Sequence, residues 1–337
     1  MPHLHCRKPA RHSRQSGFTL IEMMISITIG LAILAGLVGV LATNSSNSKT
    51  NDRTSELMTN GRYALNSIKQ ELREAGFRGY TWAEPSTPSP WTAPANASGC
   101  YGTEAGASAS LFVSNIRQGV WGSNNANPFA ATCIPAARYQ AGTDVLVVRR
   151  LAVIPTNAAL VAGPVYFRTI YERGQLFRTA VGAGAPVVPT FSGSTQLPAT
   201  FEVQIFVYYI SPFTVAATEV PLVPSLRRVA LQTTGANAGT MVDELVASGI
   251  ERMQVQYGRL TTAPDTQYLN TLAGNSSDAA ETAWDETHAV RIWLLARNST
   301  PEPGFVNNTT YAMGDANFTP GDNFRRQLFT TVVQLRN

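Results

Sequence analysis

One long apolar stretch constrains this chain more than any other feature of its sequence. Residues 18–43 read FTLIEMMISITIGLAILAGLVGVLAT and carry a single charge, Glu22. The stretch exceeds the roughly 20 residues that a helix needs to cross the hydrocarbon core of a bilayer. We therefore expect a transmembrane helix over residues 18–43. A lone carboxylate inside it needs an explanation, because ionisable groups at membrane depth usually have a partner.

The flanks of this stretch predict its orientation. The basic residues Arg7, Lys8, Arg11 and Arg14 precede it, and the polar sequence NSSNSKTNDR follows it. By the positive-inside rule, the N-terminus lies in the cytoplasm and the rest of the chain on the other side. A cleaved secretory signal peptide is the alternative, although its apolar region should be only about 7–15 residues long.

An amphipathic helix is predicted to continue beyond the membrane. Apolar residues recur at helical spacing between charged ones, and they are Leu57, Ala64, Leu65, Ile68, Leu72 and Ala75. Gly76 and Gly79 are placed to end this helix. Since no proline interrupts the sequence between the leader and Pro85, one helix of about 55 residues is allowed.

Small residues in the apolar half offer surfaces for close contact with other helices. They are Ala32, Ala35, Gly36 and Gly39, and small residues at such spacing let helix backbones approach each other in membranes. The alternative is that they are ordinary residues of a membrane helix. A helix this long cannot be buried in its own domain, so lipid or similar helices must cover its first half.

The remainder of the chain predicts a loop-rich region followed by strands. Residues 80–142 are rich in Pro, Ser, Ala and Gly, whereas residues 143–337 contain apolar segments with period-two alternation, such as TFEVQIFVYYI, and a hairpin pattern turning at Arg173-Gly174. The expected fold class is α+β, with the long helix packed on a mainly antiparallel β-sheet head. TFEVQIFVYYI is expected to be a half-buried strand.

Two cysteines of the body could form a disulfide. Cys100 and Cys133 are the only cysteines after Cys6 of the leader, and they are either free thiols or a pair. An oxidising compartment favours the pair. Closing a loop of 133 − 100 = 33 residues would stabilise the fold by about 3–4 kcal/mol in the chain-entropy description.

Charge and histidine content argue against an enzyme and against a nucleic-acid partner. Without the four basic leader residues, 26 − 4 = 22 basic residues face 22 acidic ones, so the body is neutral. His288 is the only histidine outside the leader, and G-x-S-x-G, GxxxxGK[ST] and CxxC motifs are absent. We expect no catalytic residues, no cofactor and no metal site.

Paired charges have both a functional and a structural interpretation. Asp243-Glu244 and Asp285-Glu286 could hold calcium, but solvated turns are the simpler prediction. The arginine pairs are Arg149-Arg150, Arg227-Arg228 and Arg325-Arg326. They could touch DNA, but because they are scattered along the chain we predict that they form salt bridges on the surface.

The N-terminus resembles a known processing signal. A short basic leader, Gly17, the FTLIE of residues 18–22 and a long apolar helix are similar to the class III signal of type IV pilins and type II secretion pseudopilins. The resemblance implies that prepilin peptidase cuts between Gly17 and Phe18 and methylates the new N-terminus at Phe18. It also implies that Glu22, together with Thr19, serves assembly, with the freed α-amine of an adjacent subunit as the partner of Glu22.

The C-terminal third resembles the PilW group of minor type IV pilins. The segments that carry this resemblance are ELVASGIERMQVQYG (244–258), AVRIWLLAR (289–297) and FRRQLFTTVVQLRN (324–337). The resemblance implies a non-enzymatic subunit that joins other minor pilins and the major pilin on the inner-membrane assembly platform. It further implies that this subunit primes pilus assembly and sits at the pilus tip. The pilus would then support twitching motility, adhesion or DNA uptake. The alternatives are a J-type minor pseudopilin of type II secretion and a tip adhesin or DNA-binding module.

Together these observations divide the chain into five expected segments. They are the leader at residues 1–17, the transmembrane half of the helix at 18–43, its amphipathic periplasmic half at 44–79, the loop-rich region with the cysteine pair at 80–142, and the β-rich head at 143–337.

Overall fold

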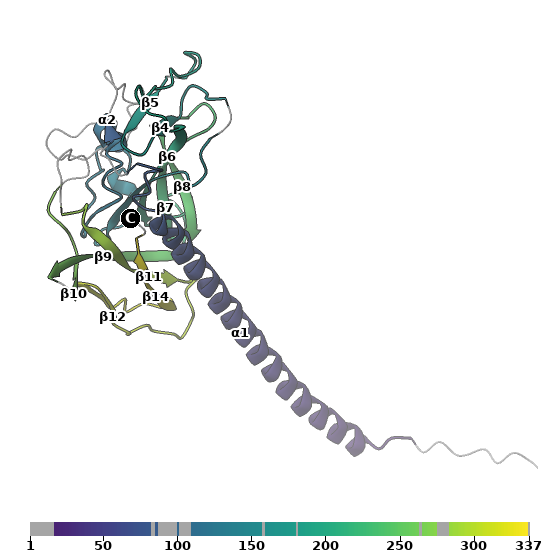
Figure 1. Ribbon diagram of the computed structural model, residues 1–337. Helices are drawn as coiled ribbons and strands as arrows, with labels where there is room; N and C mark the ends of the chain where they lie inside the picture. Colours follow the sequence, from purple (N-terminus) through teal and green to yellow (C-terminus); the bar gives the residue numbers. More distant parts are fainter. Residues whose placement is uncertain are drawn as a thin grey trace, which may run out of the picture. The chain divides into compact units, whose positions relative to one another are not determined.

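The chain consists of a long helix and a β-rich body (Figure 1). The computed structural model describes residues 17–81, 85–86, 100, 109–156, 159–179, 181–262, 265–274 and 283–335. The predicted basic leader before Gly17 lies outside the described residues. The chain divides into two compact units, Met1–Asp52 and Arg53–Asn337, and helix α1 (Leu20–Arg73) contributes to both.

The first half of α1 exposes its apolar side chains. Leu31 is 61% exposed and Leu37 56% exposed, and the most apolar window of the helix has no buried residue. By length and composition, α1 is the one helix among the described residues that could cross a membrane.

The second half of α1 has a buried face, as its periodicity predicts. Its buried residues are Leu57, Gly61, Ala64, Ile68 and Leu72. Gly76 and Gly79 follow the helix with φ of 78° and 70°, a region that glycine adopts without a Cβ clash, so both end the helix as expected. The backbone N–H of Gly76 donates to the carbonyl of Arg149 at 2.9 Å, which joins the end of the helix to a strand.

The larger sheet is built around β6 (Ala199–Ser211). Its path runs β1-β5-β4-β6-β3-β2, with β7 paired to β6 and β8 paired to β7, and only the β1–β5 pair is parallel. The other members are β1 (Pro85–Ser86), β2 (Val120–Ser123), β3 (Val145–Leu151), β4 (Val165–Thr169), β5 (Gly174–Arg178), β7 (Ser225–Leu231) and β8 (Met241–Ser248).

The second sheet contains the C-terminal strands in the order β10-β9-β11-β14. These are β9 (Ile250–Thr262), β10 (Asp265–Leu269), β11 (Thr287–Arg297) and β14 (Arg326–Gln334). A separate hairpin pairs β12 (Tyr311–Met313) with β13 (Ala316–Phe318), and the short helix α2 (Ala109–Ser114) and a 3-10 turn (Ala136–Arg138) lie earlier in the chain. The predicted α+β fold with a mainly antiparallel head is confirmed.

Gly249 connects the two sheets between β8 and β9. Its φ is 77°, and a Cβ there would lie 2.9 Å from the carbonyl oxygen of Arg297. A residue with a side chain would therefore meet both backbone strain and a steric clash at this connection.

The prediction for β6 is right in its first half and wrong in its second. Buried Phe201, Val203 and Ile205 alternate with less buried residues, whereas every residue from Phe206 to Tyr209 is buried. β3 and β7 pair with the two edges of this part of β6, and other elements pack on its faces: Tyr208 lies near Glu71 of α1, and β6 also contacts β9 of the second sheet. Both faces of the strand are covered, which local alternation cannot reveal.

The predicted hairpin exists, but its turn lies earlier than expected. β4 and β5 pair with Thr169 opposite Gly174, and the N–H of Ile170 donates to the carbonyl of Arg173 at 2.9 Å. The turn is therefore centred on Tyr171 and Glu172 rather than on Arg173-Gly174. Gly174 is needed for packing, because a Cβ there would clash with the ring of Phe167.

Candidate functional site

Thr19 and Glu22 form a capping box at the start of α1. The Glu22 carboxylate accepts hydrogen bonds from the Thr19 backbone N–H at 2.9 Å and from the Thr19 hydroxyl at 2.8 Å. In return, the Glu22 N–H donates to the Thr19 hydroxyl oxygen at 3.3 Å. This reciprocal arrangement satisfies backbone donors that the first turn of a helix leaves without intrahelical partners.

The capping box gives Glu22 a partner within its own chain. The family resemblance implies a partner in an adjacent subunit, but the TLIE of residues 19–22 is also the pattern that marks a capping box before an apolar stretch. A carboxylate is also favoured at a helix N-terminus by the helix dipole. The position of Glu22 in the first turn of α1 therefore has a local structural reason.

Gly17 and Phe18 precede the first helical residue. Phe18 is 85% exposed, and a Cβ on Gly17 would meet nothing within 4 Å. Their backbone is thus outside the helix and accessible, as a peptidase requires. Their role in processing stays a prediction.

The small residues predicted for helix packing lie within the exposed half of α1. Cβ atoms on Gly36 and Gly39 would meet nothing within 4 Å, and Ala32 and Ala35 are also exposed. Among the described residues, nothing of this chain packs on them. A role in packing against other helices stays a prediction.

The structure joins Cys100 to Cys133 in a disulfide. The Cα atoms lie 5.0 Å apart, within the range that disulfides adopt, and Cys100 is fully buried. Cys100 and part of the segment around Cys133 belong to the hydrophobic core, together with Phe112, Phe129 and Ile134. The bond thus anchors the region that the sequence predicts to be loop-rich.

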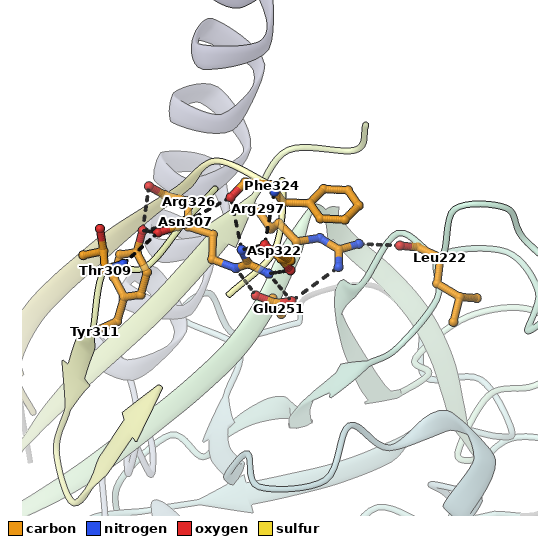
Figure 2. A network of polar contacts seen from close by, with 9 residues as sticks. All are labelled: Leu222, Glu251, Arg297, Asn307, Thr309, Tyr311, Asp322, Phe324 and Arg326. Carbon is orange, nitrogen blue, oxygen red and sulfur yellow. Dashed lines mark hydrogen bonds and ion pairs between the residues drawn. The ribbon is translucent and has the colours of Figure 1, made fainter. Parts of the chain in front are cut away.

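A polar cluster joins the three C-terminal segments singled out in the sequence (Figure 2). The side chain of Arg326 is only 1% exposed. Its guanidinium binds two carboxylates: Glu251 at 2.6 and 3.0 Å, and Asp322 at 2.6 and 2.7 Å. Arg297 also donates to Glu251, at 3.4 Å. Segments 244–258, 289–297 and 324–337 therefore each contribute one charged residue, which are Glu251, Arg297 and Arg326.

The cluster extends to the loops on either side. Arg297 donates to the carbonyl of Leu222, and its guanidinium lies 4.2 Å from the ring centroid of Phe324. The Asn307 amide donates to the carbonyl of Phe324 at 3.0 Å and to the Tyr311 hydroxyl at 3.1 Å, and its oxygen accepts from the N–H of Thr309. The cluster thus joins the start of β9, the end of β11, the start of β14 and the segment between β11 and β14.

The electrostatics of this cluster favour the ionised forms of Arg326 and Asp322. Burial alone would lower the pKa of Arg326, but the hydrogen bonds that it donates to Asp322 and Glu251 outweigh burial and raise its pKa. The same hydrogen bonds hold the pKa of Asp322 below its usual value. Because each charged group is paired, the cluster is suited to holding segments together rather than to transferring protons.

The prediction that the arginine pairs form surface salt bridges is right about the ion pairs of five of the six residues and wrong about the location of three of them, because the side chains of Arg150, Arg227 and Arg326 are only 9%, 13% and 1% exposed. Arg150 binds Glu71 at 2.7 Å and Glu74 at 2.6 Å, which ties β3 to the end of α1. The remaining pairs join Arg227 and Arg228 to Asp243 and Glu244, and Arg325 to Glu302. Arg149 is fully buried instead, and it donates to the carbonyls of Phe112 and Gln118.

The predicted solvated turns are wrong for Asp243 and Glu244 and right only in part for the other pair, because Glu286 is exposed whereas the Asp285 side chain is 13% exposed and binds Arg117 at 3.1 Å. Asp285 and Glu286 lie in a turn, whereas Asp243 and Glu244 lie within β8. Successive strand residues point to opposite faces, and on each face an arginine of the adjacent β7 binds the carboxylate. His288 lies in β11, and its Nε2 is 3.1 Å from the hydroxyl of Thr266.

Both ends of the chain match models of known protein families. Residues 207–337 match the family model described as Type IV Pilus-assembly protein W, and residues 12–38 match the Prokaryotic N-terminal methylation motif. Comparison with curated proteins and with solved structures gives no match. The first match contains all of the C-terminal polar cluster, and the second contains Gly17, Phe18, Thr19 and Glu22.

Proposed function

We propose that this chain is a minor pilin of the PilW type, which the two family matches support, and that it joins other minor pilins in a membrane complex that primes pilus assembly and ends at the pilus tip. Membership of a pilus-assembly family implies contact with other pilus components. The apolar half of α1 anchors the chain in the membrane, and the β-rich head is soluble.

The single observation that carries the proposal is the combination of the two matches on one chain. The methylation motif covers the start of α1, and the PilW region covers the sheet against which the end of the same helix packs. Prepilin peptidase is the proposed processing enzyme, with cleavage after Gly17 and methylation at Phe18. The proposed orientation has the N-terminus in the cytoplasm and the head in the periplasm before assembly.

In this proposal, Glu22 has two successive partners. In the membrane, its carboxylate is held by Thr19 of the same chain at 2.8 and 2.9 Å. During assembly, the α-amine of an adjacent subunit, freed at Phe18, competes for this carboxylate. The local pair thus keeps the carboxylate hydrogen-bonded until a neighbouring subunit arrives.

The test is the yield of surface pili sheared from a strain that lacks this chain, compared with the parent strain and with the same strain re-supplied with the gene. We expect the yield to collapse and to return on re-supply. Unchanged pili would contradict a role in priming.

The same strains test the two alternatives. A J-type pseudopilin predicts normal pili and a loss of type II secretion, and a dispensable tip adhesin or DNA-binding module predicts normal pili with a loss of attachment or DNA uptake. Twitching motility should fall together with the pilus yield if the proposal holds.

A further inference from the structure

The strand β14 forms an open edge of the second sheet. Among the described residues it pairs with β11 alone, in an antiparallel register without a bulge from Ala289 opposite Gln334 to Arg297 opposite Arg326. An unpaired edge presents a row of backbone donors and acceptors that another strand can use. The question is which of these groups are available.

The hydrogen bonds at the two ends of β14 identify the outward-facing backbone groups. The Asn298 N–H donates to the Arg325 carbonyl at 3.1 Å, and the Leu335 N–H donates to the His288 carbonyl at 2.8 Å. In an antiparallel pair, alternate residues bond to the partner strand, so odd-numbered residues of β14 bond to β11. The outward-facing residues are Leu328, Thr330, Val332 and Gln334. No backbone hydrogen bond from another described segment reaches these four.

The sequence of this edge has none of the usual protection against pairing. Residues 327–335 read QLFTTVVQL, with no charge and no proline, and Val332 is 47% exposed. Natural edge strands are commonly protected by lysine, proline, bulges or a covering segment. An exposed strand of β-branched residues without such features is expected to be covered by a partner in the assembled state.

A basic groove runs beside the C-terminal part of this edge. It has a volume of about 580 Å³, and it is lined by Lys69 and Arg73 of α1 and by residues 332–335. Neither Lys69 nor Arg73 forms an ion pair with a described residue, whereas Glu71 and Glu74 of the same helix segment bind Arg150. The groove therefore has two cations available for an acidic partner.

We propose that the edge of β14 accepts an extended strand from a different subunit of the pilus, with an acidic side chain of that strand bound by Lys69 and Arg73. This is β-strand addition, in which backbone hydrogen bonds supply affinity and side-chain positions supply specificity. A second copy of this chain fits less well, because its own β14 carries no carboxylate. The proposal rests on the proposed function as a minor pilin.

The test is residue-resolved hydrogen–deuterium exchange of the full chain in detergent, alone and mixed with the other minor pilins of the same pilus. In the chain alone, the amides of Leu328, Thr330, Val332 and Gln334 should exchange quickly and those of Phe329, Thr331 and Val333 slowly. In the mixture, the first set should slow at least tenfold. Unchanged exchange would overturn the proposal, and slowing that depends only on the concentration of this chain would replace it with self-pairing.

Variants separate the two parts of the site. Val332→Pro removes an outward N–H that makes no bond to β11, and it should abolish the slowing, whereas Val332→Ala should not. The double variant Lys69→Glu and Arg73→Glu should weaken the slowing, because an acidic strand would then be repelled. Retained protection of Phe329 and Thr331 shows that each variant folds, and slowing that persists in Val332→Pro would contradict strand addition.

Failure of strand addition at β14 can be distinguished from failure of the proposed priming role. If the deletion strain keeps normal pili, the priming role fails. If the deletion strain loses its pili but the outward amides never slow in the mixture, only strand addition at β14 fails.

Discussion

The two halves of α1 have the same secondary structure but opposite surroundings. From Leu20 to Asp52 the side chains are exposed or nearly so, including Ile33 at 66%, whereas beyond Arg53 the residues Ala64, Ile68 and Leu72 are fully buried. Residues 20–42 of the first half are almost uniformly apolar, and the second half is apolar on one face only. Helix formation is thus common to both halves, and the source of stabilisation differs.

This difference shows which half depends on other molecules. Exposed leucine and isoleucine side chains gain burial only from lipid or from other subunits, at about 25 cal/mol per Å² of apolar surface. The second half obtains its burial from the head of its own chain. Changes in the first half should therefore affect processing and assembly, and changes in the second half should affect the stability of the head.

The largest expected effect is on processing in the first half. Gly17→Leu places a bulky side chain beside the proposed cleavage point, so the chain should keep its leader and surface pili should disappear. The intact mass of the membrane-extracted chain measures this directly, and Ser16→Ala provides a neighbouring control that should be processed. A Gly17→Leu chain of mature mass would contradict the assignment of the cleavage point.

The next effect concerns Glu22 and separates its two partners. Glu22→Ala removes both the cap and the charge, and surface pili should be lost. Glu22→Gln keeps an acceptor for the Thr19 N–H and hydroxyl but has no charge for an incoming amine. We expect pilus loss in Glu22→Gln as well, measured by the yield of sheared pili.

Normal pili in Glu22→Gln would show that capping alone is sufficient, and normal pili in Glu22→Ala would contradict both roles. The unfolding midpoint of the head should be unchanged in both variants, since Glu22 makes its contacts within the first turn of the helix.

In the second half, Arg150→Met should destabilise the head. The side chains of Arg150 and Glu71 are 9% and 12% exposed, and loss of the arginine leaves Glu71 and Glu74 without their cation. Breaking a buried pair costs about 3–5 kcal/mol, and the partial exposure of Glu74 reduces this to about 2–3 kcal/mol. Urea unfolding followed by tryptophan fluorescence measures the loss.

The matched control is Arg73→Met on the same helix, which should change the stability by less than about 0.5 kcal/mol. Equal effects of the two variants would show that the Arg150 ion pairs do not hold the helix to the head.

The pH dependence of unfolding should arise from the head, because residues 23–48 contain no ionisable side chain. Burial raises the pKa of Asp144 to about 7, although its carboxylate accepts from the N–H groups of Asn125 and Val255. The pKa of an unfolded aspartate is about 3.9, so the native state binds the extra proton between these values and stability should fall as pH rises from about 4 through 7.

The expected decrease between pH 5 and pH 8 is about 2.5 kcal/mol, from the free energy of roughly 1.4 kcal/mol per pKa unit. The measurement is the urea midpoint across this pH range. Asp144→Asn, which resembles the protonated carboxyl, should remove most of the slope, and a slope unchanged in this variant would exclude Asp144 as its source.

The smallest expected effect is on the stability of the head, when a glycine is replaced by alanine in each half of α1. Gly61 lies against the ring of Phe329 in β14, where a Cβ would clash, whereas Gly36 has open space around it. Overpacking costs about 1–3 kcal/mol, and the better helix propensity of alanine returns about 1 kcal/mol. Gly61→Ala should therefore destabilise the head by about 1 kcal/mol, and Gly36→Ala should leave it unchanged in the same urea titration.

Local patterns in the sequence predicted the elements that depend on near neighbours. The apolar stretch, the buried face at Leu57, Ala64, Ile68 and Leu72, and the helix end at Gly76 follow from helical periodicity and from glycine chemistry. The TLIE capping signal is equally local, whereas the family resemblance points Glu22 only to a partner in another subunit.

Tertiary structure alone decided which distant residues meet. Glu251, Arg297 and Arg326 come from segments up to 75 residues apart and share one buried cluster. Phe206 to Tyr209 are all buried because elements distant in the sequence, among them α1 and β9, pack on β6. Hydrogen bonds between strands and ion pairs between loops depend on register and topology. Periodicity along the chain states which side of a segment is apolar, but it carries no information about which segment will cover that side.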